Sequence, residues 1–578
     1  MQSRLTVGTK RKLSTSRSPS SSRVTCPASD EFSAILSHFY PRHEISNAEC
    51  DKYIHGIIPR PLSILEAAVS ETATARNEIS AKHSVIHWFK RDLRTHDNKS
   101  LSLASQRAER EGVPLICVFL ISEQDYEAHL TSPARVNLEI ETVKILKADL
   151  EEKLDVPLYV ELVGQRKDLP TRIIQLCEKF GARHLFCNIE YEVDELRREA
   201  LLIRRCADDA GIDFTVVHDA CVVQPGELAT KQGKQYAVFT PWYKSWLAHI
   251  RNNEGEYLHI YEYPSRNHHS AKTKFKDIYV SSVPDAPARK ALTNEEKNRL
   301  QELWPAGEHE ALSRLQRFLD EKSGRYKVER DFPAADCTSL LSPYIACGAL
   351  SARTIVKSAM ERNDGSMDGR CSGIATWTSE IAWREFYKHV LVHCPYICMD
   401  KPFKLDYSDL RWEYNSSNFS AWCTGKTGYP LVDAAMRQLR HTGYMHNRCR
   451  MIVASFLSKD LLLDWRMGER YFMSQLVDGD FASNNGGWGF ASSTGVDPQP
   501  YFRVFNPVLQ SEKFDPDGVY IKKWVPELQN LYAPAIHFPY ERGGGEIARR
   551  AGYPRPIVDH QEARKRALAR YREALGRY

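Results

Sequence analysis

The chain has 578 residues, of which 42% are hydrophobic and 26% charged, and its formal net charge is +5. This length exceeds that of one ordinary domain, and the composition is typical of a globular protein with a sizeable core. No apolar run is long enough to span a bilayer, so no membrane partner is expected, while the small net charge leaves nucleic-acid binding open. The 14 scattered cysteines include no C-x-x-C pair, which indicates reduced thiols and no metal site.

The first 23 residues are basic and rich in serine, and no acid precedes Asp30. Because such a composition resists folding on its own, we expect residues 1–83 to form a disordered extension. The pattern is typical of a mitochondrial presequence, and the Lys-Arg-Lys run at 10–12 also fits a nuclear signal. The expected location is the nucleus, the mitochondrion or both, and an inert tail is the alternative.

Five short apolar runs separated by helical stretches lie between residues 84 and 220. They are Ser84–Phe89, Pro114–Leu120, Leu158–Val163, His184–Asn188 and Phe214–Asp219. This alternation predicts an α/β domain with a Rossmann-like parallel sheet covered by helices. No G-x-G-x-x-G follows the first run, so a dinucleotide bound in the usual Rossmann manner is not indicated.

The remainder of the chain is polar at first and then helical. Residues 221–325 contain many Pro, Ser and Lys residues, which indicates an interdomain connection with some helix. Residues 326–545 are predicted to form an all-α domain, and residues 546–578 an exposed basic helix. Around residues 430–443 the apolar side chains share one helical face, with Pro430 near the start and Gly443 past the end.

The segment WTSEIAWREFYKH (Trp377 to His389) places a carboxylate between two indoles if it is helical. Glu380 is then three residues from both Trp377 and Trp383, and Tyr387 lies one turn further on. Because burial of an unpaired carboxylate is costly, a plain core is not built this way. The alternative is a surface helix with an amphipathic aromatic stripe.

Two further segments carry groups that suit a nucleotide. In MHNRCRM, Asn447 and Met451 face one way with Arg448 beside them, whereas Arg450 points elsewhere. An amide, a thioether and a guanidinium suit a flat, polar-edged base and a phosphate. The hydroxyls of residues 338–351 are expected to cap a following helix, where phosphate binds well, although most such caps hold no ligand.

Residues 478–507 form an unusual, loop-like stretch that combines small residues with one tryptophan. Asp478 and Asp480 can accept hydrogen bonds from ring N–H and ribose hydroxyl groups, and the Gly-Gly pair at 486–487 lets backbone approach a ring. Arg503 could reach a phosphate. Core packing is the alternative for any single tryptophan, Trp488 included.

Taken together, these segments resemble the DNA photolyase/cryptochrome family. The matching motifs occur in order and include FKRDLRTHDN, VFTPWYKSW, ERDFPAADCTSLLS, WTSEIAWREFYKH, TGYPLVDAAMRQL, YMHNRCRMIVASFLSKDLLLDW, GERYFMSQLVDGDFASNNGGWGF and YFRVFNP. The resemblance extends over about residues 84–540 and, within the family, is to class I cyclobutane pyrimidine dimer photolyases. It implies the photolyase/cryptochrome fold, with an α/β antenna domain and an all-α FAD-binding catalytic domain.

The resemblance also implies site residues, position by position. FAD is expected to contact Tyr326, Thr338, Ser339, Leu340, Leu341, Ser342, Trp377, Arg384, Arg450, Asp478, Gly479, Asp480 and Asn484. The lesion is expected to contact Glu380, Trp383, Asn447, Met451 and Phe490, the last standing where the bacterial pattern has tryptophan. DNA phosphates are expected at Arg330, Arg448 and Arg503, and electron transfer is expected to run through Trp412, Trp465 and Trp488.

The antenna chromophore implied by the resemblance is methenyltetrahydrofolate, at Asp194 and Glu195. Asp194 replaces the bacterial asparagine, and Met399 stands where the bacterial pattern has a lysine. Both are departures from the bacterial folate-binding pattern, and a deazaflavin is the alternative.

The implied activity is light-dependent splitting of pyrimidine dimers in UV-damaged DNA by a monomeric photolyase using reduced FAD. A cryptochrome photoreceptor is the main alternative, but plant-type cryptochromes carry an acid at the position of Asn484. A photolyase for the (6-4) lesion is associated with a histidine pair, whereas this chain has Asn447 and Met451. A non-catalytic flavoprotein that binds DNA is a third alternative.

Overall fold

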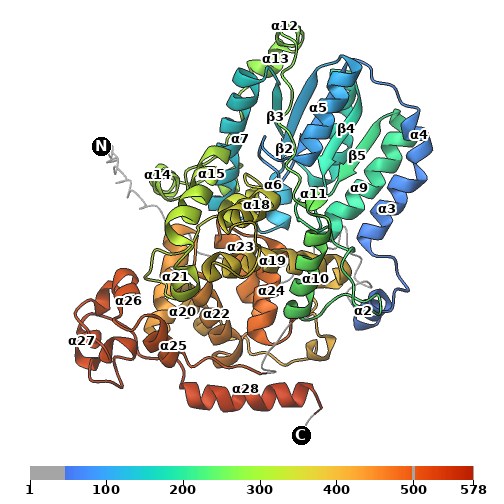
Figure 1. Cartoon of the computed structure of the whole chain (residues 1–578). Coiled ribbons are helices and arrows are strands. Elements are labelled where there is room, and N and C mark those ends of the chain that lie inside the picture. The colour runs from blue at the N-terminus through green and yellow to red at the C-terminus, as the bar shows by residue number, and fades with distance from the viewer. Residues whose placement is uncertain (1–45, 497–501, 577–578) are drawn as a thin grey trace, which may run out of the picture.

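The computed structural model describes residues 46–496 and 502–576 of the chain. An α/β domain, uppermost in Figure 1, rests on a larger assembly of helices. Among these described residues, no helix has both the length and the apolar character that crossing a membrane requires. The α/β domain and the helical assembly together confirm the predicted combination of an α/β domain with an all-α domain.

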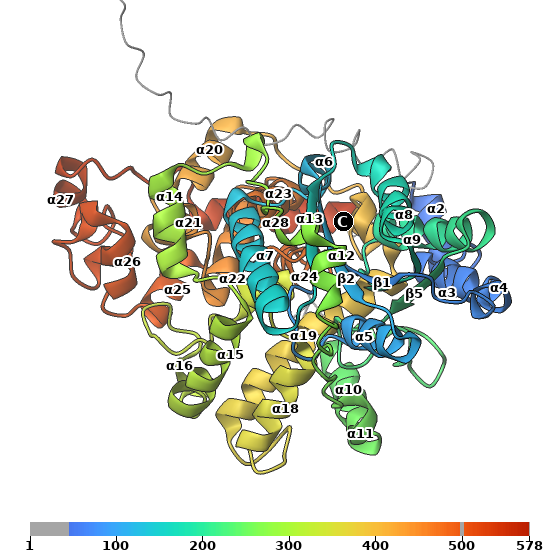
Figure 2. The same ribbon diagram turned by 90° about the horizontal axis from the view of Figure 1, so that it is seen from above.

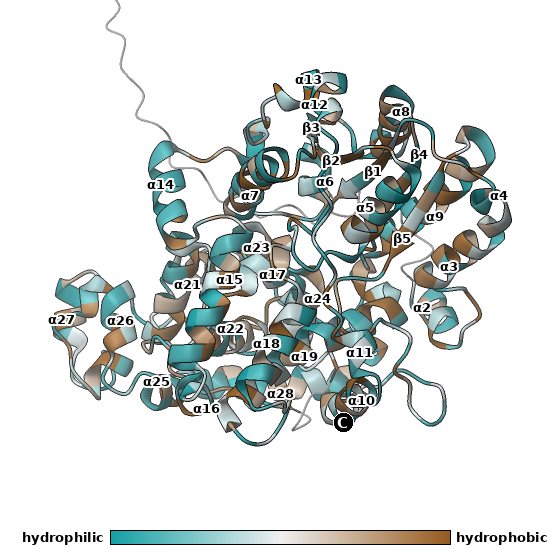
Figure 3. Ribbon diagram, turned by 45° about the horizontal axis from the view of Figure 1, so that its top comes forward, coloured by the Kyte–Doolittle hydropathy of each residue, from teal (hydrophilic) through white to brown (hydrophobic). Residues whose placement is uncertain are grey.

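The α/β domain is built on a five-stranded sheet whose strands all pair in parallel, in the order β3-β2-β1-β4-β5. All five predicted strands are confirmed, and their bounds are β1 (Ser84–Phe89), β2 (Leu115–Ile121), β3 (Leu158–Leu162), β4 (Ala182–Asn188) and β5 (Asp213–Val217). The hydrophobic strands lie among helices with hydrophilic outer faces (Figure 3). Those helices are α5 (Lys99–Glu111), α6 (Glu123–Ala128), α7 (Pro133–Lys153), α8 (Leu169–Phe180) and α9 (Val193–Arg205).

The expectation that residues 1–83 form a disordered extension is wrong for residues 47–77, which we call the N-terminal clasp. The clasp comprises helices α2 (Asn47–Ile54), α3 (Pro61–Glu71) and α4 (Ala73–Asn77). Helix α3 buries Leu62 and Leu65 against α9. Because this apolar partner is distant in the sequence, the composition of the segment alone does not reveal it. The targeting signals predicted in residues 1–23 lie outside the described residues.

The clasp also reaches the helical domain. Arg60 Nε donates to the His393 carbonyl at 2.9 Å, and Lys401 Nζ donates to Asn47 Oδ1 at 2.8 Å. Arg76 pairs with Asp213 at the start of β5, 2.9 Å apart. The N-terminal clasp thus joins the two domains along one side of the molecule (Figure 2).

The connection between the domains contains more helix than the sequence indicated. Its helices are α10 (Phe239–Asn252), α11 (Glu254–Tyr257), α12 (Ser270–Lys274), α13 (Lys276–Tyr279), α14 (Asn294–Leu303) and α15 (Glu308–Arg317). Helix α10 packs on α19 (Ser372–His393), the central helix of the helical domain. The connection therefore takes part in the core of the helical domain.

The helical domain surrounds α19 (Ser372–His393), which contacts α10, α16, α18 and α24. Its other helices are α16 (Tyr326–Glu329), α17 (Ser342–Cys347), α18 (Ala352–Arg362), α20 (Ser416–Thr424), α21 (Pro430–Thr442), α22 (Asn447–Ser455), α23 (Trp465–Gln475), α24 (Phe481–Ser492), α25 (Pro507–Phe514), α26 (Val519–Trp524), α27 (Gly545–Arg550) and α28 (His560–Ala574). Helix α21 has the predicted proline at its start and Gly443 at its C-cap with φ of 67°.

Two predictions for the C-terminal half are wrong in part. The supposedly loop-like stretch from Asp478 contains α24, because Asp480 caps it by accepting from the Ser483 amide at 2.9 Å. Helix α28 is basic but not simply exposed. Its Ala563, Ala567 and Tyr571 side chains are buried, since they repeat at helical spacing and face the domain.

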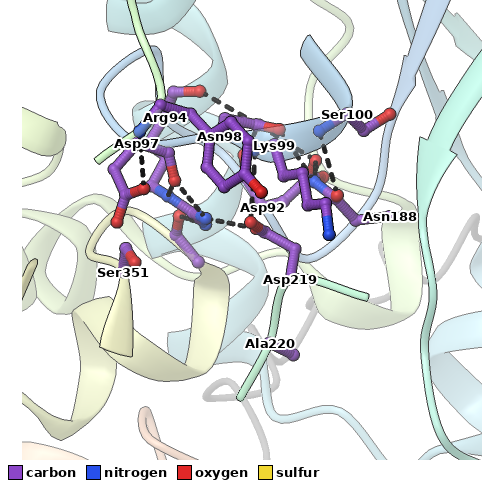
Figure 4. A network of polar contacts seen from close by, with 12 residues as sticks. Asp92, Arg94, Asp97, Asn98, Lys99, Ser100, Asn188, Asp219, Ala220 and Ser351 are labelled. Carbon is purple, nitrogen blue, oxygen red and sulfur yellow. Dashed lines mark hydrogen bonds and ion pairs between the residues drawn. The ribbon is translucent and has the colours of Figure 1, made fainter. Parts of the chain in front are cut away.

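A buried polar network joins the two domains at the carboxyl end of β1 (Figure 4). Asp219 accepts from Arg353 Nη2 at 2.6 Å and pairs with Arg94. Asp97 accepts from the same Arg353 at 2.9 Å and from Thr354 at 3.0 Å. Because Arg353 lies on α18 and the two carboxylates belong to the α/β domain, these bonds fix how the domains sit together.

We expect Leu65→Ala to destabilise the protein, because Leu65 is 1% exposed between α3 and α9. Truncation of a buried leucine costs about 2–5 kcal/mol. The melting temperature of the purified protein should fall by several degrees. Ser63→Ala, on the exposed face of α3, is the matched control. Equal melting temperatures for the two variants would show that the clasp does not stabilise the fold.

Candidate functional site

Helix α19 carries Trp377, Glu380, Trp383, Arg384 and Tyr387, as the sequence predicted. The Trp383 ring is half-buried and stacks on Phe239 of α10, with 3.8 Å between ring centroids and 9° between ring planes. Phe239 in turn stacks on Tyr243, 5.4 Å away. One face of Trp383 therefore rests on two further rings, which holds its plane fixed for stacking against another flat group.

Glu380 has a charged partner, which the sequence did not reveal. Its Oε1 lies 2.6 Å from Arg330 Nη1. Burial raises the pKa of the Glu380 carboxyl, and the Arg330 charge opposes that rise. Arg330 is followed by Asp331, whose carboxylate lies 2.8 Å from Arg448 Nη2 on α22. These two adjacent residues thus link α19 to the start of α22.

The start of α22 carries the predicted lesion-binding residues at or near the protein surface. Asn447 is exposed, Met451 is half-buried, and the Arg448 guanidinium lies 4.4 Å from the Phe514 ring centroid. Arg450 points to the interior, as its helical spacing predicts, and pairs with Asp478 at 2.7 Å. The two arginines therefore serve different parts of the site.

Two carboxylates line the inner part of the site, and each is held by basic side chains. Asp478 accepts from Arg450 and from Ser342 Oγ, the latter at 2.7 Å. Asp480 lies 3.0 Å from Lys388 Nζ. Burial acts against its charge, yet Lys388 and Arg384 hold the pKa of Asp480 well below its usual range. Asp480 is therefore a fixed negative charge at all ordinary pH values.

Helix α24, which follows these carboxylates in the chain, packs closely against α19. A Cβ on Gly486 would lie 2.1 Å from the Tyr387 ring, so only glycine lets α24 approach α19 this closely. A Cβ on Gly487 meets no atom within 4 Å, and Gly487 is exposed although α24 lies inside the domain. Asn484 Nδ2 donates to the Glu469 carbonyl at 3.0 Å, which orients its amide.

The expectation that hydroxyls of residues 338–351 cap a helix is confirmed at one end of the segment and wrong at the other. Ser351 caps α18, because its Oγ accepts from the Arg353 amide at 3.1 Å. Helix α17 instead begins at Ser342 with Leu341 as N-cap and no side-chain cap bond, and Leu340 has φ of 52°. The Ser342 hydroxyl donates to Asp478, and Thr338, Ser339 and Leu340 are half-buried.

The three predicted electron-transfer tryptophans are all buried. Trp465 shares a small cavity with Gly489, the neighbour of Trp488, and Gly468 of the same helix α23 lies against the Trp488 ring. Glu413 N donates to the Leu462 carbonyl at 2.8 Å, which places Trp412 beside the segment that leads into Trp465. Trp412 is covered by Tyr571 of α28, with 6.1 Å between ring centroids.

Asp194 and Glu195 lie in a charged cluster at the start of α9. Arg166 pairs with both, and His129 Nε2 lies 2.8 Å from Glu195 Oε1. Asp125, His129 and Glu195 could each offer one ligand atom to a metal ion, but the Arg166 guanidinium already lies among them. A hollow lined by His129 and Asp194 continues to Cys398 and Glu469 of the helical domain.

Several residues that shape the site were not singled out from the sequence. Lys388, Asp331, Phe239, His129 and Arg166 complete the ion pairs and stacks described above. Lys388 could have been found, because it follows Arg384 by four residues on the same helix and hence shares its face. The other four meet their partners only through long-range contacts, so no local pattern marks them.

Two family models match the chain. The model described as DNA photolyase matches residues 85–260, and the FAD binding domain of DNA photolyase matches residues 377–573. A deoxyribodipyrimidine photo-lyase of Neurospora crassa is 54% identical over 95% of this chain and 91% of its own length. The mitochondrial deoxyribodipyrimidine photo-lyase of Saccharomyces cerevisiae is 37% identical over 94% of this chain and 96% of its own.

Solved structures show the same architecture. A class III photolyase from Agrobacterium tumefaciens superposes with a TM-score of 0.73 at 33% identity, covering 85% of this chain and 98% of its own. A cryptochrome from Synechocystis has the same TM-score at 28% identity, covering 84% and 98%. An α/β domain joined to a helical domain that carries this cluster of ion pairs and stacked rings is the architecture of the photolyase and cryptochrome class of flavoproteins. The chain belongs to the DNA photolyase family.

The side chains gathered here suit the FAD of this family. Asp478 and Asp480 offer acceptors to ring and ribose donors, while Arg384 and Arg450 supply positive charge for phosphates. A side chain at Gly487 would meet no protein atom within 4 Å, so this position of α24 is open. The residues that the sequence predicted for FAD remain the ones we expect to hold it.

We expect Asp480→Asn to lower the flavin content of the purified protein. The change leaves the buried Lys388 ammonium without its anion, and loss of one member of a buried ion pair costs about 3–5 kcal/mol. The ratio of flavin to protein absorbance measures the effect. Asp517→Asn, at an exposed position, is the control. Equal flavin content in both variants would contradict the assignment of Asp480.

Proposed function

We propose that this protein is a deoxyribodipyrimidine photo-lyase that splits cyclobutane pyrimidine dimers in UV-damaged DNA under light. Relatives with that name align with it over most of both chains, including one from Escherichia coli at 38% identity. The observation that carries the proposal is the cluster organised by Arg330 and Asp331. These adjacent residues pair with Glu380 of α19 and Arg448 of α22, and the stacked Trp383 ring lies one turn after Glu380 on α19.

The chain's own residues bind and orient the damaged dinucleotide. A dimer pairs poorly and is therefore extruded from the duplex more easily than an intact base. Trp383 stacks on it and Phe490 provides a second aromatic contact, while Met451 packs alongside. Glu380 and Asn447 hydrogen-bond the polar edges of the pyrimidines.

Two kinds of charge act on the bound DNA. The Arg330–Glu380 pair is held at the polar edge of the bound pyrimidines, where its field acts on the negative charge that the dimer gains. Arg330, Arg448 and Arg503 contact backbone phosphates, which positions the strand without reading its sequence. When bound, reduced FAD supplies the electron that light drives into the dimer, and the protein supplies position and field.

The main test is an assay of purified, photoreduced protein on an oligonucleotide that contains one thymine dimer. We expect thymines to be restored under blue light and not in darkness. Glu380→Ala should lower the repair yield severalfold while flavin content stays nearly unchanged, because the residue acts on the lesion. Flavin-loaded protein that repairs nothing in the light would favour the cryptochrome alternative, and unchanged yield in Glu380→Ala would remove that residue's role.

The cryptochrome alternative is kept because the Synechocystis cryptochrome superposes as well as the photolyase does. Fold likeness therefore does not separate repair from light sensing. Asn484 does favour repair, since its amide is oriented by the Glu469 carbonyl and carries no ionisable proton.

Trp412, Trp465 and Trp488 are proposed to carry electrons between the protein surface and the flavin. Their order follows from the contacts of α23 with α24 and of Glu413 with Leu462. Trp488→Phe should block light-driven reduction of the oxidised flavin but spare repair by chemically reduced enzyme. Absorbance of the oxidised flavin under illumination gives the first result and the dimer assay the second. Loss of repair by the pre-reduced variant would refute this division of roles.

The remaining proposals concern the antenna, location and assembly. Methenyltetrahydrofolate is proposed at the cluster of Asp194, Glu195 and His129, which borders a hollow between the domains. A mitochondrial destination is supported by the yeast relative, whose name includes that compartment, and a nuclear one by the basic run at 10–12. We propose that the protein acts as a monomer.

A further inference from the structure

Lys459 is a buried lysine that the proposed chemistry leaves unused. It lies in the π-helical turn η8 (Phe456–Asp460), directly after α22, and is 1% exposed. Its ammonium donates to Ser493 Oγ at 2.8 Å and to the Arg503 carbonyl. It also lies 4.9 Å from the centroid of the Phe502 ring. Three of its contacts thus belong to the stretch on either side of residues 497–501.

Both hydrogen-bond acceptors of Lys459 are neutral oxygens, which is a costly environment for a buried charge. Burial lowers the pKa of Lys459 to about 7, Asp460 opposes this shift, and Arg503 adds to it. Asp460 is itself engaged by His560 of α28, with 2.5 Å between His560 Nδ1 and Asp460 Oδ1. A lysine in this environment contributes little as an ion-pair partner. Its structural role is therefore to hold the oxygens that it binds in place.

What Lys459 holds is the backbone that leads to Arg503. Phe502 is fixed from the other side by Tyr571 of α28, with 4.8 Å between ring centroids. Further along, the Phe505 amide donates to Ser455 Oγ at 3.4 Å. The carbonyl of Arg503 is therefore anchored inside the domain while its side chain is exposed to solvent. The exposed guanidinium lies 5.6 Å from the Phe505 ring centroid, so both ends of the residue are placed by this anchored stretch.

We propose that Lys459 is a positioning residue for DNA binding, which anchors the main chain at Arg503 so that the Arg503 guanidinium meets a backbone phosphate beside the lesion. The inference rests on the proposed function, because it assigns a phosphate to Arg503. It goes beyond that function by placing the control of this contact in the interior, at a residue that does not touch DNA.

The anchor should respond to pH near neutrality. Below pH 7 the folded protein holds Lys459 protonated, and a charged donor binds a carbonyl more strongly than a neutral amine does. Affinity for DNA is thus expected to fall as the pH rises from 6 to 8. The charged groups that face this site are Asp460, His560, Arg566 and Arg503. If His560 alone caused the pH dependence of DNA affinity, that dependence would persist when Lys459 is replaced.

The test is a double-mutant cycle measured by fluorescence anisotropy in the dark, on an oligonucleotide with one thymine dimer. Lys459→Met and Arg503→Ala should each weaken binding by about tenfold and lower the salt dependence by about one phosphate contact. The double variant should bind no more weakly than Arg503→Ala, because Lys459 acts through Arg503. Lys459→Met should also lose the fall in affinity between pH 6 and 8.

Additive losses in the double variant, or an unaltered affinity in Lys459→Met, would overturn the proposal. Flavin content and light-driven flavin reduction report whether each variant is folded. If Lys459→Met does not fold, Ser493→Ala removes one of the two acceptors, and its smaller loss of affinity should likewise vanish in the Arg503→Ala background. Lys565→Met, on the exposed face of α28, is the control. Wild-type protein that does not bind the oligonucleotide would instead refute the proposed function.

Discussion

The burial of Asp97 and Asp219 between the domains is the constraint on which the rest of the structure depends. A carboxylate removed from water is destabilising by several kcal/mol unless it is paired, so both domains must supply partners. Arg353 of the helical domain binds both carboxylates, and Arg94 adds a second bond to Asp219. Any rotation of one domain against the other would leave at least one of these charges unpaired.

The same network extends to the ligand-binding helix. The residues that follow Asp219 lie beside α19. Arg384 of α19 donates to the Ala220 carbonyl at 3.0 Å. Glu385, the next residue, accepts from the Val222 amide and from Trp246 of α10. The position of α19 is therefore set by the domain boundary, and the stack behind Trp383 is set by α10.

Charged groups within the site are paired with one another before any ligand arrives. Arg330 with Glu380, Arg448 with Asp331, Arg450 with Asp478 and Lys388 with Asp480 form four such pairs. Each partner restrains the rotamers of the other, so the groups need little rearrangement to meet a flavin or a nucleotide. This preorganisation is the usual way in which a protein lowers the cost of binding a polar ligand.

Local patterns in the sequence predicted the strands and the long helices, because a parallel sheet and an amphipathic helix each leave a periodic signature. Residues 84–89 and 430–442 are clear examples. Helical spacing of polar residues also marked α19 and α22, whereas the stretch that contains α24 was expected to be a loop. The clasp at 47–77 was missed because its apolar face is short and is buried only by packing against α9.

Partners from distant parts of the chain could not be predicted in the same way. Glu380 was considered as an unpaired carboxylate, yet Arg330, 50 residues earlier, neutralises it. The hydroxyls near Thr338 were expected to cap a helix, but tertiary contact with Asp478 takes Ser342 instead. In both cases the energy of a buried ion pair or hydrogen bond overrode the local preference on which the expectation rested.

The glycines of α23 and α24 determine where this pocket can change during evolution or design. A methyl group at Gly468 would lie 2.1 Å from the Trp488 ring, and one at Gly486 would lie 2.1 Å from Tyr387. Neither position tolerates any other residue without separating two core helices. A side chain at Gly487 would meet no protein atom within 4 Å, so this position has room for a larger residue. A library that seeks new cofactor or light preferences should hold the first two glycines constant and place its diversity at residue 487.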